Sequence, residues 1–571
     1  HAYANDNPHI LANLQADIPS GDFLFTLIDG YFERVNLVFP ILHRPLFESQ
    51  LRNNLHTQDG DFMRLLLVVC AVGARWCKDP RVLDDQWSSE LSAGYRWFRS
   101  AYKGGINVLY RPSLVNIQFT VLSVVFLLGT SFDDMTWFFA AKASRMFEAL
   151  GSHRRKQSRT LADELMKRAF RCHFILDCFT STTVGKPSAL QNIDVDVDDV
   201  MEIDDLQWTP DLHALPPPPQ RSSLQLAALN HAYRLCITID QALQTVYAPT
   251  SVKRQIGLGS SQGEEWIARS LNQQLNRWAA PIPGNLRLPD QEDFTKCPIP
   301  HLYSTVTLWT GYCYAAICIN RPFITSKVPE ISTTSFHNCR QAARQRAKMI
   351  QAYYEVPTAL PLQFAIAGVF SSAMILLIDS IANSPTGRPR EDTTLDSQGY
   401  SAVANERHLR ICSATLERLE KYYHIAGRLN DIIKEFQDFW TSRLAAQPTG
   451  TQPLKSLDSY DPCTASSFTL KNLESPALSQ PPPGVSTLAW KQSTSPYLTT
   501  QTPGLFEMGI PSLSFSQTQT ISHLTSISNE LHSSPHDSGV LSEEWMLNID
   551  KILFPGGIVY DLDSSPAEPG K

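Results

Sequence analysis

Residues 224–246, LQLAALNHAYRLCITIDQALQTV, carry the pattern that decides the fold class. Apolar or weakly polar side chains recur every three or four residues over about six turns, so they share one face of a helix. Ser222 or Ser223 is the expected N-terminal cap, directly after a proline run at residues 216–219. The residues that form this face are Leu224, Ala228, His231, Leu235, Ile239, Ala242 and Val246.

The same period appears along most of the chain. Phe139, Ala143, Met146 and Leu150 lie on one helical face, and further helices are expected at residues 339–354, 362–382 and 405–423. Alternating runs of β-branched residues, which would indicate strands, are nearly absent. Residues 22–445 are therefore predicted to form one large all-α, multi-helix domain, preceded by an N-terminal linker at residues 1–21.

The most apolar stretch, residues 114–129, is predicted to be a core helix. It is shorter than the roughly 20 residues that a membrane-spanning helix needs, and it contains Asn116, Gln118 and Ser123. We expect no membrane partner.

Charge and cysteine content exclude several classes of protein. The 571 residues carry 49 basic and 56 acidic side chains, a net charge of -7, which does not fit a broad basic face for nucleic acid. The 11 cysteines form no CxxC pair, so neither a zinc finger nor a disulfide framework is expected within the chain. A DNA-binding module outside these residues remains compatible with the composition.

The composition changes after residue 445. Between residues 451 and 540, 39 of 90 residues are Ser, Thr or Pro, so residues 446–536 are predicted to be a disordered linker. Residues 537–571 are predicted to contain a short acidic amphipathic helix, which Ser542 caps and Pro555 ends. Its bulky residues are available to dock on a partner or back on the helical domain: Leu541, Trp545, Ile549, Ile552, Leu553 and Phe554.

Six sequence blocks, in this order, resemble the fungal-specific transcription factor domain, the middle region of fungal binuclear zinc-cluster regulators. The first is YFERVNLVFPILHRPLF at residues 31–47, with Phe39, Pro40, His43 and Phe47; the second is an apolar helix at residues 117–129. Residues 150–154, LGSHR, hold Gly151, His153 and Arg154, and a charged-to-aromatic helix ends at Asp177. The last blocks contain Gly185, Lys186, Pro187 and Asp194, and then Arg321 and Pro322.

The resemblance implies the regulatory and transactivation portion of a nuclear transcription factor that controls RNA polymerase II genes. It implies no enzyme activity, no catalytic or metal-binding residue and no cofactor in this chain. Zinc is expected in a DNA-binding module upstream of His1, since the chain starts at His and is expected to be a fragment. The terminal helix would be the activation segment for coactivators, and a small-molecule effector and a homodimer are open alternatives.

Two other functions stay open. Asp198-Asp199-x-x-Glu202, in the acidic run at residues 194–211, resembles the aspartate-rich motif of terpene synthases, all-α enzymes that use magnesium. A second motif at residues 430–438 carries Lys434 where a ligand is needed, which argues against this function. The other alternative is an interaction scaffold without DNA binding.

Local features give two structural predictions. Gly185 is expected to end a helix in the left-handed conformation. Asp177, near the end of an apolar helix, is expected to pair with Arg154 or Arg168, because buried acids need partners.

Overall fold

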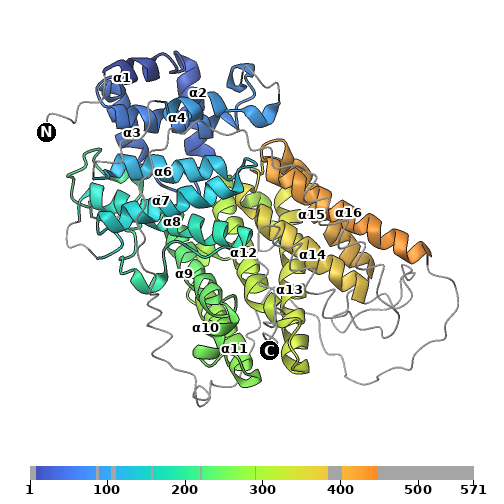
Figure 1. The fold of residues 1–571 in the computed structure, drawn as a ribbon. Coiled ribbons are helices and arrows are strands. Elements are labelled where there is room, and N and C mark those ends of the chain that lie inside the picture. The colour runs from blue at the N-terminus through green and yellow to red at the C-terminus, as the bar shows by residue number, and fades with distance from the viewer. Residues whose placement is uncertain are drawn as a thin grey trace, which may run out of the picture.

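The computed structural model describes residues 8–84, 89–103, 111–155, 159–218, 222–289, 291–382 and 402–446 (Figure 1). Within these ranges there are helices, short 3-10 turns and loops but no extended strand, so the all-α prediction is confirmed. The first eight helices are α1 (Pro8–Gln15), α2 (Asp22–Arg34), α3 (Arg44–Arg52), α4 (Gly60–Ala74), α5 (Tyr95–Ala101), α6 (Leu114–Leu127), α7 (Asp133–Ala149) and α8 (Leu161–Val184). The others are α9 (Leu224–Thr245), α10 (Thr250–Gln255), α11 (Ser261–Ala279), α12 (Ile299–Asn320), α13 (Pro329–Tyr354), α14 (Ile366–Ala382), α15 (Ala402–Glu420) and α16 (His424–Ala446).

Most helices pack against the one before them in the chain. Contacts run from α2 through α4, α6, α7, α8 and α9 to α12, and then through α13, α14 and α15 to α16. The amino-terminal helices lie at the top of the molecule in this view, α9, α12 and α13 run through its centre, and α15 and α16 lie along the right-hand side (Figure 1). The buried apolar side chains of this array form one large core and a small second cluster.

The ends of the helices follow local capping chemistry. Ser113 and Thr160 each form a capping box, with Asn116 and Asp163 respectively, at the starts of α6 and α8. Gly185 ends α8 at φ 66°, so the predicted left-handed helix end is confirmed.

The helix predicted at residues 224–246 is present as α9. It begins at Leu224, but the Ser223 side chain makes no capping hydrogen bond. The Ser222 hydroxyl donates to the carboxylate of Glu202 at 2.6 Å. Ser223 therefore occupies the predicted N-cap position, but without the side-chain hydrogen bond expected of a cap, and Ser222 binds Glu202 instead.

The predicted core helix is confirmed as α6, in which every residue from Ile117 to Leu127 is buried. A longer apolar stretch, Gln363–Ser380, could cross a membrane by length and composition alone, but 78% of it is buried inside the protein. It includes most of α14, which packs on α12, α13 and α15. This stretch is therefore part of the protein core.

Residues 8–21 belong to the folded domain, which differs from the predicted linker. Leu14 in α1 is 1% exposed, and the carbonyl oxygen of Asp17 accepts a 3.0 Å hydrogen bond from Trp97 Nε1. An eight-residue helix is too short to show a clear period in the sequence. The predicted linker after α16 and the activation segment, with Leu541, Trp545, Ile549, Ile552, Leu553 and Phe554, lie outside the described residues.

Candidate functional site

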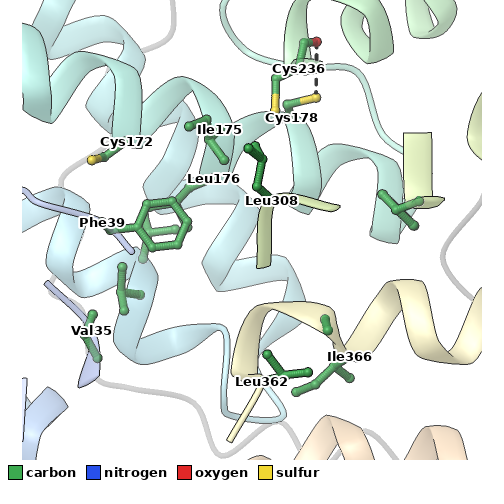
Figure 2. Packing of buried hydrophobic residues seen from close by; sticks show 14 of the residues in the cluster. Val35, Phe39, Cys172, Ile175, Leu176, Cys178, Cys236, Leu308, Leu362 and Ile366 are labelled. Atoms are coloured by element: carbon green, nitrogen blue, oxygen red, sulfur yellow. Dashed lines mark hydrogen bonds between the residues drawn. The ribbon is translucent and has the colours of Figure 1, made fainter. Parts of the chain in front are cut away.

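An apolar cavity of about 170 Å³ lies among α8, α9, α12 and α14, beside the loop that follows α2. In Figure 2, Phe39, Ile175, Leu176 and Leu308 gather near one another from three separate segments, and Ile366 lies across from them. Ile175, Leu176, Leu308 and Ile366 come from the buried faces of helices, so the periodicity that builds the core also builds most of the wall, and Phe39 comes from the loop after α2. The cavity therefore has the position and the lining of a small-molecule site between helices.

Small and aromatic residues shape this space. Gly311 on α12 also lines it, and a Cβ at this position would stand 3.5 Å from Leu235. Phe39 packs edge-on against Phe364, with ring centroids 4.6 Å apart and planes at 79°. Phe39 therefore connects the first sequence block to the cavity wall.

One buried cation also lines the cavity. The Arg346 side chain on α13 is fully buried and donates from Nη1 to Ser372 Oγ at 3.1 Å and from Nη2 to the Thr310 carbonyl oxygen at 2.6 Å. Its Nε has no hydrogen-bond partner among the described residues. Burial lowers the pKa of this guanidinium, because a charged group loses its hydration there.

A second polar group of the lining is also unpaired. Thr180 on α8 is 2% exposed, and its Oγ1 has no hydrogen-bond partner among the described residues. Buried hydroxyl groups are rarely left without a partner. The apolar cavity thus presents two polar groups with unused hydrogen-bonding capacity.

The acidic run at residues 194–211, which we call the acidic strap, lies against α8 and α9. Asp199 accepts from Arg171 Nη2 at 2.7 Å and also binds Arg234. Asp205 pairs with the buried Arg168 at 2.5 Å. Asp196 and Asp198 both lie 3.3 Å from the exposed Arg155. The strap is therefore an ordered element held by arginines.

The backbone of the acidic strap is fixed as well. The Asn230 amide accepts from Val200 N at 3.1 Å and donates to Val200 O at 2.9 Å. Met201 N donates to Glu164 Oε2 at 3.0 Å. Ile203 and Trp208 of the strap pack with Leu46, Leu161 and Leu165 in the second apolar cluster.

These contacts argue against the magnesium-enzyme alternative. The motif residues Asp198 and Asp199 bind arginines, and the Glu202 carboxylate accepts from Ser222. In the second motif, Lys434 pairs with Glu417 at 2.8 Å. Within the described ranges no three His, Cys, Asp or Glu side chains come together as metal ligands.

His43 joins the first sequence block to the acidic strap. Its Nδ1 accepts from Leu46 N at 3.2 Å and caps α3, while its Nε2 lies 2.9 Å from the carbonyl oxygen of Asp205. This arrangement requires a neutral imidazole that donates from Nε2, and burial lowers its pKa accordingly. In the same block Pro40 is buried, and Phe47 packs on Phe32 and Phe62.

The predicted ion pair of Asp177 was wrong. Its Oδ2 accepts from the backbone N–H groups of Ala189 and Leu190 at 2.9 and 3.3 Å, and Arg168 pairs with Asp205 instead. Burial, and then the nearby Asp240, raise the pKa of Asp177 to about 7. Asp177 therefore holds the loop after α8, and backbone donors replace a cation.

The turn after α8 makes structural contacts. Lys186 Nζ lies 4.9 Å from the centre of the Trp137 ring and 2.5 Å from Asp134. The carbonyl oxygen of Pro187 accepts from Trp137 Nε1 at 3.1 Å. These contacts fasten the turn to α7.

The remaining motif residues lie away from the cavity. Gly151 adopts φ 66° after α7, the His153 carbonyl accepts from Asp196 N at 2.9 Å, and the Arg154 and Asp194 side chains are exposed. Arg321 donates to the Tyr247 hydroxyl at 2.9 Å, and Pro322 lies next to it in the 3-10 turn Arg321–Phe323. Of the fourteen predicted domain residues, Phe39 lines the cavity; the sequence reasoning missed Arg346 and Thr180.

Comparison with known proteins gives a consistent result. Residues 28–280 match the family model described as the fungal specific transcription factor domain. The transcriptional activator protein acu-15 of Neurospora crassa is 22% identical over 359 residues, covering 60% of this chain and 36% of that protein. An uncharacterized transcriptional regulatory protein of Schizosaccharomyces pombe is 23% identical over 431 residues, covering 72% of this chain and 64% of that protein.

A third relative, a putative transcriptional regulatory protein of Saccharomyces cerevisiae, is 22% identical over 395 residues, covering 63% of this chain and 50% of that protein. The chain thus spans about a third to two thirds of the length of these relatives.

Proposed function

We propose that this chain is the regulatory and transactivation portion of a fungal transcription regulator, because residues 28–280 match the family model described as the fungal specific transcription factor domain. The family match is the observation that carries the proposal. The matched residues include α6, α8 and α9, which line the cavity, and α12 to α14 close it from outside the match.

The cavity suggests how the domain would be regulated. We propose that a small molecule binds there and changes how the helices around it pack. A ligand can shift such an equilibrium only by as much as its affinities for the two states differ. The side chains around the cavity come from elements distant in sequence, so a ligand would contact both parts of the domain at once.

DNA binding would come from a zinc module outside residues 1–571. The described residues of this chain do not fit a zinc cluster, since no group of three metal-ligating side chains is present among them. His173, which follows Cys172 in the sequence, lies in the core, with Nε2 2.8 Å from Ser144 Oγ and its ring stacked on Phe147. The phosphate and base contacts would be made by that outside module.

Transactivation is assigned to the segment around Leu541 and Phe554. Its bulky side chains among acidic ones suit docking in the groove of a coactivator, with folding on contact. Docking back on the helical domain would hide the same side chains, so release from that contact would be a means of control. Nuclear location and pairing into a homodimer belong to the same proposal.

A reporter experiment tests the proposal. The full chain is fused to an unrelated DNA-binding domain, and expression from its promoter is measured in fungal cells. We expect the fusion to activate the reporter and the double variant Trp545→Ala/Phe554→Ala to weaken it severalfold. The matched control is Trp490→Ala/Phe506→Ala, which removes the same residue types from the predicted linker. An inactive wild-type fusion would favour the scaffold alternative. Equal reporter output from the two double variants would contradict the assignment of the activation segment.

A further inference from the structure

Arg346 differs from its neighbours on α13 in how its charge is balanced. Arg344 donates to Asp379 at 2.9 Å and to Asn405 at 2.9 Å, and Arg340 also donates to Asp379 at 3.2 Å. Arg346 donates to a serine hydroxyl and a backbone carbonyl, both of them neutral, and its guanidinium carbon lies 6.0 Å from the centre of the Tyr314 ring, but no described carboxylate pairs with it. α13 therefore carries two buried arginines: Arg344 pairs with a carboxylate, and Arg346 does not.

The groups around Arg346 do not supply the missing negative charge. Those that influence its ionisation are Cys313, Cys318, Cys412 and Tyr314. Burial raises the pKa of the Cys313 thiol to about 11 and that of the Cys412 thiol to about 12, and it raises the values for Cys318 and Tyr314 as well. All four are neutral at pH 7. A buried cation without a counter-charge is costly, so its presence next to a cavity points to an anion that binds there.

The backbone makes room for the guanidinium. A Cβ at Gly368, on α14, would overlap Nη1 of Arg346, so the absence of a side chain at this position allows the arginine to reach the cavity. Both residues line the cavity, and the unpaired Oγ1 of Thr180 lines it too. The rest of the lining is largely apolar and includes Phe39, Leu176 and Leu308.

We infer that this cavity binds a small organic carboxylate, with the carboxylate on the Arg346 guanidinium and an apolar body against Phe39, Leu176 and Leu308. A volume of about 170 Å³ is close to the roughly 150 Å³ of an apolar cavity that accepts benzene. The body is therefore about the size of one aromatic ring or a short alkyl chain. The inference rests on the proposed function, because it names the chemical class of the effector.

The test uses the purified full chain and benzoate as the probe, with benzamide as its neutral isostere. Binding is measured by calorimetry and by the shift in the thermal midpoint. We expect benzoate to bind at least about tenfold more tightly than benzamide, since hydrogen bonds to a charged group discriminate by about that factor. Inorganic phosphate, an anion without an apolar body, should bind more weakly than benzoate.

Three variants connect this difference to Arg346. Arg346→Gln should lose the preference for benzoate over benzamide, and Gly368→Ala should reduce benzoate binding because it displaces the guanidinium. Lys348→Gln removes a cation from the same helix outside the cavity lining and should keep wild-type binding. Arg346→Gln removes an unbalanced buried charge, so it is expected to fold; its thermal midpoint verifies this.

Three results would overturn the inference: equal binding of benzoate and benzamide by the wild type, a preference retained in Arg346→Gln, and phosphate binding as tight as that of benzoate. The reporter fusion separates this failure from failure of the proposed function. A fusion that activates the reporter while the chain ignores benzoate would leave the regulator assignment in place and remove the carboxylate site. If the fusion is inactive but the chain binds benzoate, the carboxylate site would stand and the assignment as a regulator would be removed.

Discussion

Asp199 accepts a hydrogen bond of 2.7 Å from the guanidinium of Arg171, whose side chain is only 2% exposed. The acidic strap is thus joined to α8 by a charge pair, and Arg171 also lies over the Tyr233 ring at 4.2 Å. Val197 and Val200 of the strap pack on the main core. Loss of Asp199 would therefore leave a buried cation in contact with the core.

The first prediction concerns this pair. Asp199→Asn should lower the free energy of unfolding by about 1–3 kcal/mol; this is less than for a fully buried pair, because Asp199 is half exposed. Asp198→Asn, which weakens only a contact with the exposed Arg155, should cost less than about 0.5 kcal/mol. Urea unfolding measures both changes.

Magnesium gives a further comparison for the same two variants. If these carboxylates served as metal ligands, magnesium would raise the thermal midpoint of the wild type, and either substitution would remove that effect. We expect no such stabilisation. Equal costs for Asp198→Asn and Asp199→Asn would contradict the structural role assigned to Asp199.

The second prediction concerns pH and Asp177. Its folded pKa of about 7 exceeds the unfolded value of 3.8, so the folded state holds the proton more tightly between about pH 4 and pH 7. The free energy of unfolding should therefore fall as the pH rises through this window. Asp240, raised by burial to about 6, acts in the same direction.

Asp177→Asn should flatten this slope without loss of stability at pH 7. Its Oδ1 would accept from Ala189 and Leu190, and its Nδ2 would donate to Ser181. Asp177→Ala leaves the two backbone donors unpaired and should cost about 2–3 kcal/mol. Thermal midpoints between pH 4 and pH 8 measure these effects, with the exposed Asp194→Asn as a control. A wild-type slope in Asp177→Asn would assign the pH dependence to other groups.

The sequence predicts the structural features that are set by residues close together in the chain. The helical period of α9, the buried α6 and the left-handed turn at Gly185 all follow from residues close in sequence. The partners of Asp177 and Asp199 depend on which helices lie side by side, and no local pattern encodes that. Arg346 lies in QAARQRAKMI, where basic residues are typical of an exposed helix face. Its burial follows from α12 and α14 covering α13.

Close helix contact gives the third prediction. Gly73 on α4 meets the backbone of α2, and a Cβ at this position would overlap the carbonyl oxygen of Leu27. Gly73→Ala should destabilise the domain by about 1–3 kcal/mol or more, because the helices must move apart. Gly284→Ala is the matched control, since a Cβ there meets nothing within 4 Å. Thermal unfolding compares the two, and a neutral Gly73→Ala would contradict this contact between α2 and α4.

The last prediction sets Arg346 against Arg344 under the same substitution. Arg344→Met leaves the buried Asp379 with one fewer cation and should cost about 3–5 kcal/mol, as when one partner of a buried pair is removed. Arg346→Met removes a charge that has no acid to balance it, and should leave the ligand-free protein as stable as the wild type or more stable by about 1–2 kcal/mol. Urea unfolding without added anions measures both. A loss for Arg346→Met as large as that for Arg344→Met would mean that the Arg346 charge is already balanced within the fold.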